Sequence, residues 1–173
     1  MPQKILTCFT TLILIFSIFI LTESCGVYSF KDVSIDYNKI KTIKIGFFEN
    51  KARYINPTLS SLLTNKIQQK IVSQTKLVRT NSDDANLQIS GYISDYSVTT
   101  TAIASNQATG NRLNVGVHLI VKNNVENKTD EYDVNRNFDF SADLSLQQAE
   151  VKLQDQIISN ITDEIFNRIF SNW

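Results

Sequence analysis

The sequence predicts an α+β fold, a two-layer sandwich in which two helices pack on one face of a four-stranded mixed sheet, in the order β-α-β-β-β-α. In four segments, apolar residues alternate with polar ones, which is typical of strands with one buried side. In two longer segments, apolar residues recur every three or four positions, which is typical of helices with one buried stripe. Packing the two layers together buries both kinds of apolar face.

The first predicted strand covers residues 41–48, with Ile43, Ile45 and Phe47 on its buried face. A helix then begins at Asn56-Pro57, because asparagine accepts hydrogen bonds from free N–H groups and proline fits the first helical position. The helix is predicted to end near residues 73–75. Its apolar stripe consists of Leu59, Leu62, Leu63, Ile67 and Ile71.

The second strand is predicted at residues 87–93, after a turn at residues 81–84. Because this strand follows a strand and a helix, we expect a parallel crossover between the two strands. Segment 98–110 is rich in threonine, alanine, serine and asparagine and shows no apolar face. The sequence therefore predicts a loop there.

The clearest alternation lies at residues 112–121, where every odd-numbered position is apolar. A turn is predicted within residues 123–130, and a fourth strand at residues 132–140, where Arg136 interrupts the apolar row. The opposite face of the predicted sheet is polar, so we expect it to face solvent or a partner. This face carries Lys44, Gln88, Ser90, Asn114, His118, Asp133 and Asn135.

The final helix is predicted to begin after Ser145, which forms a capping box with Gln148, and to extend almost to Trp173. Its apolar stripe consists of Leu146, Ala149, Leu153, Ile157, Ile161, Ile165 and Ile169, widened by Val151, Ile158, Phe166 and Phe170.

The sequence contains no pattern that predicts catalysis, a bound cofactor or a metal. The single histidine, His118, stands on a polar strand face without a nucleophile or a ligand partner, so a structural or surface role is the simpler interpretation. Asp83 and Asp84 are adjacent carboxylates with no third acidic residue or histidine nearby in the sequence. Equal numbers of acidic and basic residues argue against a nucleic-acid partner, which would require a basic surface.

The N-terminal region resembles the signal of a bacterial lipoprotein. An apolar segment, residues 5–21, is followed by Ser24, Cys25 and Gly26, which predicts cleavage before Cys25 and a lipid on its sulfur. An ordinary secretory signal, or an uncleaved anchor with an incidental cysteine, is the alternative. The predicted organisation is a signal peptide at residues 1–24, a lipidated leader at 25–39 and one domain at 40–173.

The predicted loop 98–110 is the best candidate for a functional segment. It is longer than a simple hairpin requires, and its small, uncharged residues suit a tip that enters a confined polar space. A flexible loop without a role is the alternative. Arg112 stands at its base, where a cation would meet an anionic head group.

Several short motifs, in this order, resemble the LptE lipoproteins, in the form found in Bacteroidetes. The motifs are Cys25-Gly26-Val27-Tyr28-Ser29-Phe30, Ile40-Lys41-Thr42-Ile43, Phe48-Glu49-Asn50, Asn56-Pro57-Thr58-Leu59-Ser60, Gly91-Tyr92-Ile93 with Tyr96, Asn111-Arg112-Leu113-Asn114-Val115, and Asp163-Glu164-Ile165-Phe166-Asn167 with Asn172-Trp173.

The resemblance implies a non-enzymatic lipoprotein with two helices on a four-stranded sheet. Its implied role is to plug an LptD-like β-barrel of the outer membrane and to help place lipopolysaccharide in the outer leaflet. It also implies periplasm-facing attachment through the lipid on Cys25, and contact of basic residues such as Arg112 with lipopolysaccharide. A lipoprotein that regulates an envelope enzyme, such as a peptidoglycan synthase, is the alternative, although it would need a longer tether after Cys25.

Overall fold

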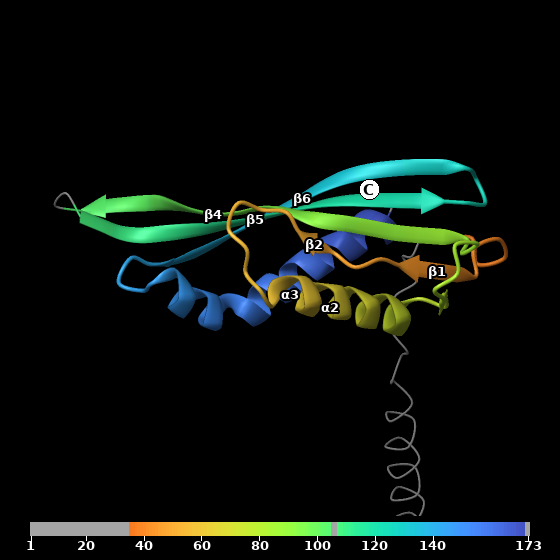
Figure 1. The fold of residues 1–173 in the computed structure, drawn as a ribbon, viewed down its shortest axis with the longest axis horizontal. Helices are drawn as coiled ribbons and strands as arrows, with labels where there is room; N and C mark the ends of the chain where they lie inside the picture. Colours follow the sequence, from red (N-terminus) through yellow and green to blue (C-terminus); the bar gives the residue numbers. More distant parts are fainter. Residues whose placement is uncertain (1–34, 105–106, 172–173) are drawn as a thin grey trace, which may run out of the picture. The chain divides into compact units, whose positions relative to one another are not determined.

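The computed structural model of the chain describes residues 35–104 and 107–171 (Figure 1). The predicted signal peptide, Cys25 and most of the predicted leader lie outside these residues. The elements, in chain order, are β1 (Thr42–Ile45), β2 (Glu49–Asn50), α2 (Leu59–Gln74), β3 (Val78–Arg79), β4 (Leu87–Ala104), β5 (Gln107–Asn123), β6 (Lys128–Ser141) and α3 (Leu146–Phe170).

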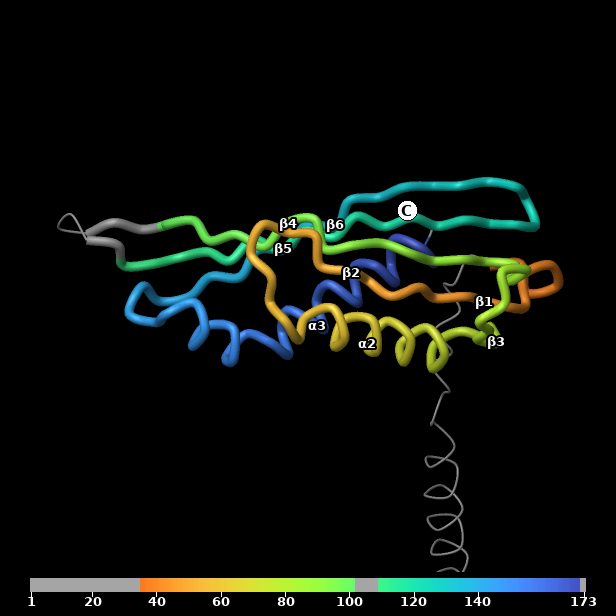
Figure 2. The backbone as a smooth tube through the Cα atoms, viewed as in Figure 1, coloured from red at the N-terminus to blue at the C-terminus, as the bar shows by residue number. Residues whose placement is uncertain are grey.

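The strands form one mixed sheet, and both helices lie on the same side of it (Figures 1 and 2). The strand order is β3-β1-β4-β5-β6, and β2 pairs with β4 beyond the end of β1. β1 is parallel to β4, which confirms the predicted crossover, and β4, β5 and β6 are antiparallel neighbours. The α+β class is confirmed, but the sheet has six strands instead of four, because β2 and β3 are too short to show an alternation.

The core lies between the sheet and the helices. The odd-numbered apolar residues of β5 are all buried, as the alternation predicts, and Val134 and Phe138 of β6 are buried beside them. From the helices, the buried apolar side chains are Leu59, Leu63, Ile67, Ile71, Ala149, Ile157, Ile158, Ile161, Ile165, Phe166 and Phe170.

The prediction for the end of the first strand is wrong by one residue. Phe47 is 56% exposed, whereas Phe48 is fully buried and its N–H donates to Thr64 Oγ1 over 3.0 Å. Ile45 lies opposite Ile89, but Glu49 lies opposite Tyr92, so the chain takes one more residue than β4 over this stretch. The extra residue reverses the alternation of inward and outward side chains.

The ring of Phe48 packs over Gly91, where the absence of a side chain makes room for it. A Cβ atom at Gly91 would lie only 2.8 Å from Phe48 Cε1. A glycine inside a strand often marks such a close approach. The two residues together close the core at the junction of β2 and β4.

Helix α2 begins at Leu59, two residues after Pro57 and later than predicted. Asn56 still organises this start, because its Oδ1 accepts from the backbone N–H groups of Thr58 and Leu59 at 3.0 and 3.1 Å. The prediction was correct about the capping side chain but placed the first helical residue too early.

Helix α3 begins with the predicted capping box. The backbone N–H of Gln148 donates to Ser145 Oγ, and the Ser145 N–H donates to Gln148 Oε1. Val151, predicted to widen the apolar stripe, is instead 81% exposed. Two residues correspond to about 200° around a helix, so Val151 points away from the side that Ala149 buries.

The largest correction concerns segment 98–110, which is a continuation of two strands and not a loop. β4 continues to Ala104 and β5 begins at Gln107, so the described residues of this segment form an antiparallel hairpin. Pairing with β5 shows irregularities between Ile93 and Asp95 and again after Thr100. We call the described residues of this segment, 98–104 and 107–110, the distal hairpin.

Candidate functional site

The solvent face of the sheet carries the polar residues that the sequence predicts there. Ser90, Asp133 and Asn135 are exposed, while Lys44, Gln88, Asn114 and His118 are partly buried by their neighbours. The β4–β5–β6 register arranges this face in rows, such as Tyr92, His118 and Asp133. On the face of the sheet that lies opposite the helices, polar groups from β4, β5 and β6 therefore lie next to one another.

His118 lies between two carboxylates of β6. Its Nδ1 is 2.8 Å from Asp133 Oδ1, and its Nε2 is 3.4 Å from Glu131 Oε2. The ring of Tyr92 lies 5.1 Å away on the other side, and the ammonium of Lys51 lies 4.8 Å from the centre of that ring. The structure therefore gives His118 two carboxylate partners that the sequence did not reveal, and its side chain is only 20% exposed.

The structure places Arg112 within β5, where it forms a two-pronged ion pair with Asp139 of β6. Arg112 Nε lies 2.6 Å from Asp139 Oδ1, and Nη2 lies 3.0 Å from Oδ2. The hydrogen bonds from Arg112 lower the pKa of Asp139, and those to Asp139 raise the pKa of Arg112. An anionic ligand at Arg112 would therefore compete with an existing partner, which the sequence did not reveal.

Between Arg112 and His118 the sheet face is made mostly of amides and hydroxyls, with Asp95 as an acidic residue beside Gly116. Asn114 Nδ2 lies 3.4 Å from both Ser97 Oγ and Thr99 Oγ1. Gly116 leaves space for its neighbours, because a Cβ atom there would lie 2.8 Å from Asn135 Oδ1. This part of the face offers the uncharged groups of Asn114 and Thr99 beside the carboxylate of Asp95, which accepts from Ser97 Oγ over 3.1 Å.

The distal hairpin extends the uncharged part of this face. The sequence between Asp95 and Arg112 contains no charged residue. Val98 is 41% exposed, and the threonines at positions 99–101 are exposed. β-Branched residues are common in strands, so these threonines are the signal that could have predicted a hairpin instead of a loop.

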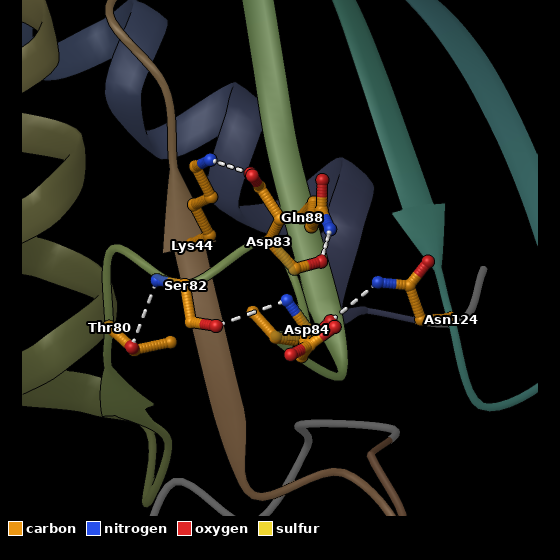
Figure 3. Close-up of polar contacts among 8 residues, drawn as sticks. Lys44, Thr80, Ser82, Asp83, Asp84, Gln88 and Asn124 are labelled. Carbon is orange, nitrogen blue, oxygen red and sulfur yellow. Dashed lines mark hydrogen bonds and ion pairs between the residues drawn. The ribbon is translucent and has the colours of Figure 1, made fainter.

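Asp83 and Asp84 serve a structural purpose at the turn between β3 and β4 (Figure 3). Asp83 forms a short ion pair with Lys44, which lowers the pKa of the Asp83 carboxyl. The Asp83 carbonyl accepts from Gln88 Nε2 over 2.6 Å, and the Asp84 N–H donates to Ser82 Oγ over 3.2 Å. Asp83 therefore stabilises this turn through its carboxylate and its carbonyl, and Asp84 does so through its backbone N–H.

Helices α2 and α3 are separated by an open groove of about 750 Å³, with Leu62 and Ile158 among its lining residues. The other residues around it are mostly amides, with Lys66 and Asp155 as its charges. Within residues 35–104 and 107–171, no helix is long and apolar enough to span a membrane. The same residues contain no cluster of histidine, aspartate and glutamate suited to a metal ion.

The chain is an α+β sandwich with a polar sheet face, and a sequence match assigns its family. The LptE family model, described as lipopolysaccharide-assembly, matches residues 40–171. The chain belongs to this family of non-enzymatic lipoproteins. No curated protein matches the chain.

Among solved structures, the chain is similar to rare lipoprotein B from Shewanella oneidensis, with 12% identity, a TM-score of 0.46, and coverage of 73% of this chain and 89% of that one. It is also similar to the hypothetical protein CT253 from Chlamydia trachomatis, with 9% identity, a TM-score of 0.48, and coverage of 75% and 98%. PelC from Paraburkholderia phytofirmans, a dodecamer, shares 8% identity, with a TM-score of 0.47 and coverage of 78% and 91%.

Proposed function

We propose that this chain is an outer-membrane lipoprotein that binds an LptD-like β-barrel and assists the insertion of lipopolysaccharide into the outer leaflet. The observation that carries the proposal is the family match over residues 40–171. The lipoprotein-like signal before Cys25 supports attachment to a membrane through a lipid, with the domain facing the periplasm.

The distal hairpin is the part of the domain best suited to enter the barrel. It is narrow, its sequence is uncharged, and its backbone groups are paired between β4 and β5 as far as Ala104 and Gln107. A segment of this kind loses little hydration energy in a confined polar space, because it brings no unpaired charge with it. The neighbouring amide surface around Asn114 extends the same chemistry toward the middle of the sheet.

The proposal is tested by depleting the protein in its native cells and restoring it with a shortened hairpin. The variant lacks residues 101–110 and joins Thr100 to Asn111, which are register partners, through an Asn-Gly turn. We expect the variant to fold and to restore neither surface lipopolysaccharide nor recovery of the barrel with the tagged protein.

The matched control shortens the opposite end of β5, where residues 124–127 connect it to β6. Val125 and Glu126 are deleted and Asn127, which already has a φ of 50°, is replaced by glycine. We expect this control to restore both measurements. Full rescue by the shortened hairpin would exclude the hairpin from the mechanism, and unchanged lipopolysaccharide export after complete depletion would exclude the proposed function itself.

The anchor is tested separately with Cys25→Ala. Loss of the acceptor sulfur should leave an unprocessed or soluble protein instead of a lipid-modified species in the outer-membrane fraction. Labelling with a radioactive fatty acid checks this directly, because only the unmodified sequence should incorporate the label. Outer-membrane fractionation of the variant at the wild-type mass would contradict the lipoprotein assignment.

A further inference from the structure

Strand β6 forms a long, open edge of the sheet. It pairs with β5 on one side in unbroken register from Asn123 opposite Lys128 to Gly110 opposite Ser141. On its other side, no strand of the described residues pairs with it, because β6 is the last strand of the sheet (Figures 1 and 2). The opposite edge of the sheet is different, because β3 has only two residues.

The direction of the β6 backbone groups follows from a hydrogen bond at its end. The Ala142 N–H donates to the Thr109 carbonyl over 3.4 Å, which makes this a hydrogen-bonded pair in the continued β5–β6 register. Because such pairs alternate in an antiparallel ladder, the even-numbered residues of β6 bond to β5 and the odd-numbered residues point their N–H and C=O groups outward. Those residues are Thr129, Glu131, Asp133, Asn135, Asn137 and Asp139.

None of the outward backbone groups of these residues is hydrogen-bonded to another residue in the described parts of the chain. Two of the devices that commonly protect an edge strand, proline and a bulge, are missing from β6. The two basic side chains of β6 are occupied elsewhere, Arg136 with Glu164 of α3 and Lys128 with Asp130.

The charges beside the outward groups are all acidic. Side chains of odd-numbered β6 residues lie on the solvent face, and among them Glu131, Asp133 and Asp139 are charged. Asp139 is held by Arg112, and Glu131 and Asp133 both contact His118, but the Glu131 and Asp133 side chains remain 60% and 70% exposed. A strand placed next to this edge would meet complementary charges if its own side chains on this face were basic.

A second copy of the chain would find no complementary charges on the solvent face of this edge. A symmetric antiparallel pairing that continues the sheet on one face places odd-numbered residues opposite odd-numbered ones, and none of these is basic. The pairing that would bring Asp130 opposite Arg136 also places Asp133 opposite its own copy, so it sets like charges against each other. The acidic row therefore favours a strand with basic side chains over a second copy of the chain.

We propose that the β6 edge binds an extended segment of a different protein by strand addition. The outward N–H and C=O groups of residues 129–139 form the backbone hydrogen bonds, and Glu131 and Asp133 select lysine or arginine side chains on the adjoining strand. This surface is separate from the distal hairpin, and it does not depend on the identity of the barrel partner.

The first test compares backbone amide exchange in two preparations of the full chain. One is the isolated protein, and the other is the native complex purified from outer membranes with a tag on this chain. In the isolated protein, the odd-numbered amides of residues 129–139 should exchange rapidly and the even-numbered ones slowly. In the complex, the odd-numbered amides should exchange at least tenfold more slowly. Equal exchange in both preparations would overturn the proposal.

The second test separates backbone bonding from simple coverage by a partner. Asn137→Pro removes one outward N–H group, whereas Asn137→Ala keeps it. Position 137 is exposed, so neither substitution changes the core. We expect about a tenfold loss of complex recovery with proline and no loss with alanine. Equal recovery of the two variants, with the same melting temperature, would contradict strand addition.

A third variant keeps the proposal testable if proline disturbs β6. Glu131→Lys reverses a charge without changing the backbone, and it should also reduce complex recovery several-fold, with the loss diminished at high salt. Sedimentation of the isolated protein tests self-association, and a dimer with protected odd-numbered amides would replace the proposed partner with a second copy. Edge protection in a complex that contains no barrel would support this proposal while contradicting the proposed function.

Discussion

The two halves of the β4–β5 hairpin are both antiparallel ladders, although their surroundings are opposite. In the half nearest the turn to β6, Ile89, Ile93 and Val117 are fully or almost fully buried beneath the helices. In the distal hairpin, the side chain of Val98 is 41% exposed and the threonines that follow it are exposed. The comparison shows that ladder hydrogen bonds can extend a sheet well beyond the hydrophobic core that stabilises it.

The difference follows from where the helical layer can reach. Among the described residues, Leu113 is the last fully buried residue of β5 on the way to the distal hairpin. Past this point, apolar side chains would have no layer to pack on, and the sequence supplies threonine, alanine and glycine. One half is therefore held by hydrophobic burial, and the other is free to contact a partner.

The largest expected effect is that of a charge in the buried half. Val117→Asp would place an unpaired carboxylate at a position with no solvent exposure, which costs several kcal/mol, on the order of the stability of a whole domain. We expect the variant to be unfolded at room temperature, as measured by circular dichroism and thermal melting.

The matched variant is Val98→Asp, the same chemical change in the distal hairpin. Because the side chain at this position already reaches water, the free energy of unfolding should fall by about 1 kcal/mol or less. Similar melting temperatures for Val98→Asp and Val117→Asp would remove the contrast between the two halves of the hairpin.

The next effect compares two neighbouring phenylalanines at the junction of β1 and β2. Phe48→Ala should cost about 3–5 kcal/mol, because it leaves a cavity beneath the sheet next to Gly91. Phe47→Ala should change stability by about 0.5 kcal/mol or less, because its ring is 56% exposed. Urea unfolding of the two variants measures the difference, and the reverse order would restore the alternation expected from the sequence alone.

Much of the fold could be predicted because the buried faces leave a period in the sequence. The odd-numbered apolar residues of 113–121 and the capping box at Ser145 are local patterns, and both predictions are confirmed. The reversal at Phe47 and Phe48 could not be predicted, since it arises from the offset between two parallel pairings with β4. Local alternation contains no information about such an offset.

The polar site was harder to predict for the same reason. A strand without an apolar face has no period, so segment 98–110 looked like a loop although β4 and β5 remain paired through most of it. The partner of Arg112 was also hidden, because Asp139 is distant in sequence and becomes its neighbour only through the β5–β6 register. Predicting it would have required knowing which residues of the two strands face each other.

The smallest expected effect concerns this ion pair, which lies at the boundary between the two halves of the hairpin. Hydrogen bonds from Arg112 hold the pKa of Asp139 below its usual value of 3.8. A carboxyl whose pKa is lowered by folding stabilises the protein above its unfolded pKa, and this stabilisation disappears as the pH falls through the folded pKa. Because both groups are exposed to solvent, the contribution should be small.

We therefore expect Asp139→Asn to lower the melting temperature slightly at neutral pH, by an amount that shrinks to nothing as the pH falls well below 3.8. Arg112→Gln is the matched variant, because it removes the cause of the shift and leaves the carboxylate in place. In that background, Asp139→Asn should have almost no effect on melting at any pH. A difference in melting temperature between the unmodified protein and the Asp139→Asn variant that stays the same at acidic pH would contradict this prediction. It would mean that the amide disturbs packing and that the charge of the ion pair contributes nothing to stability.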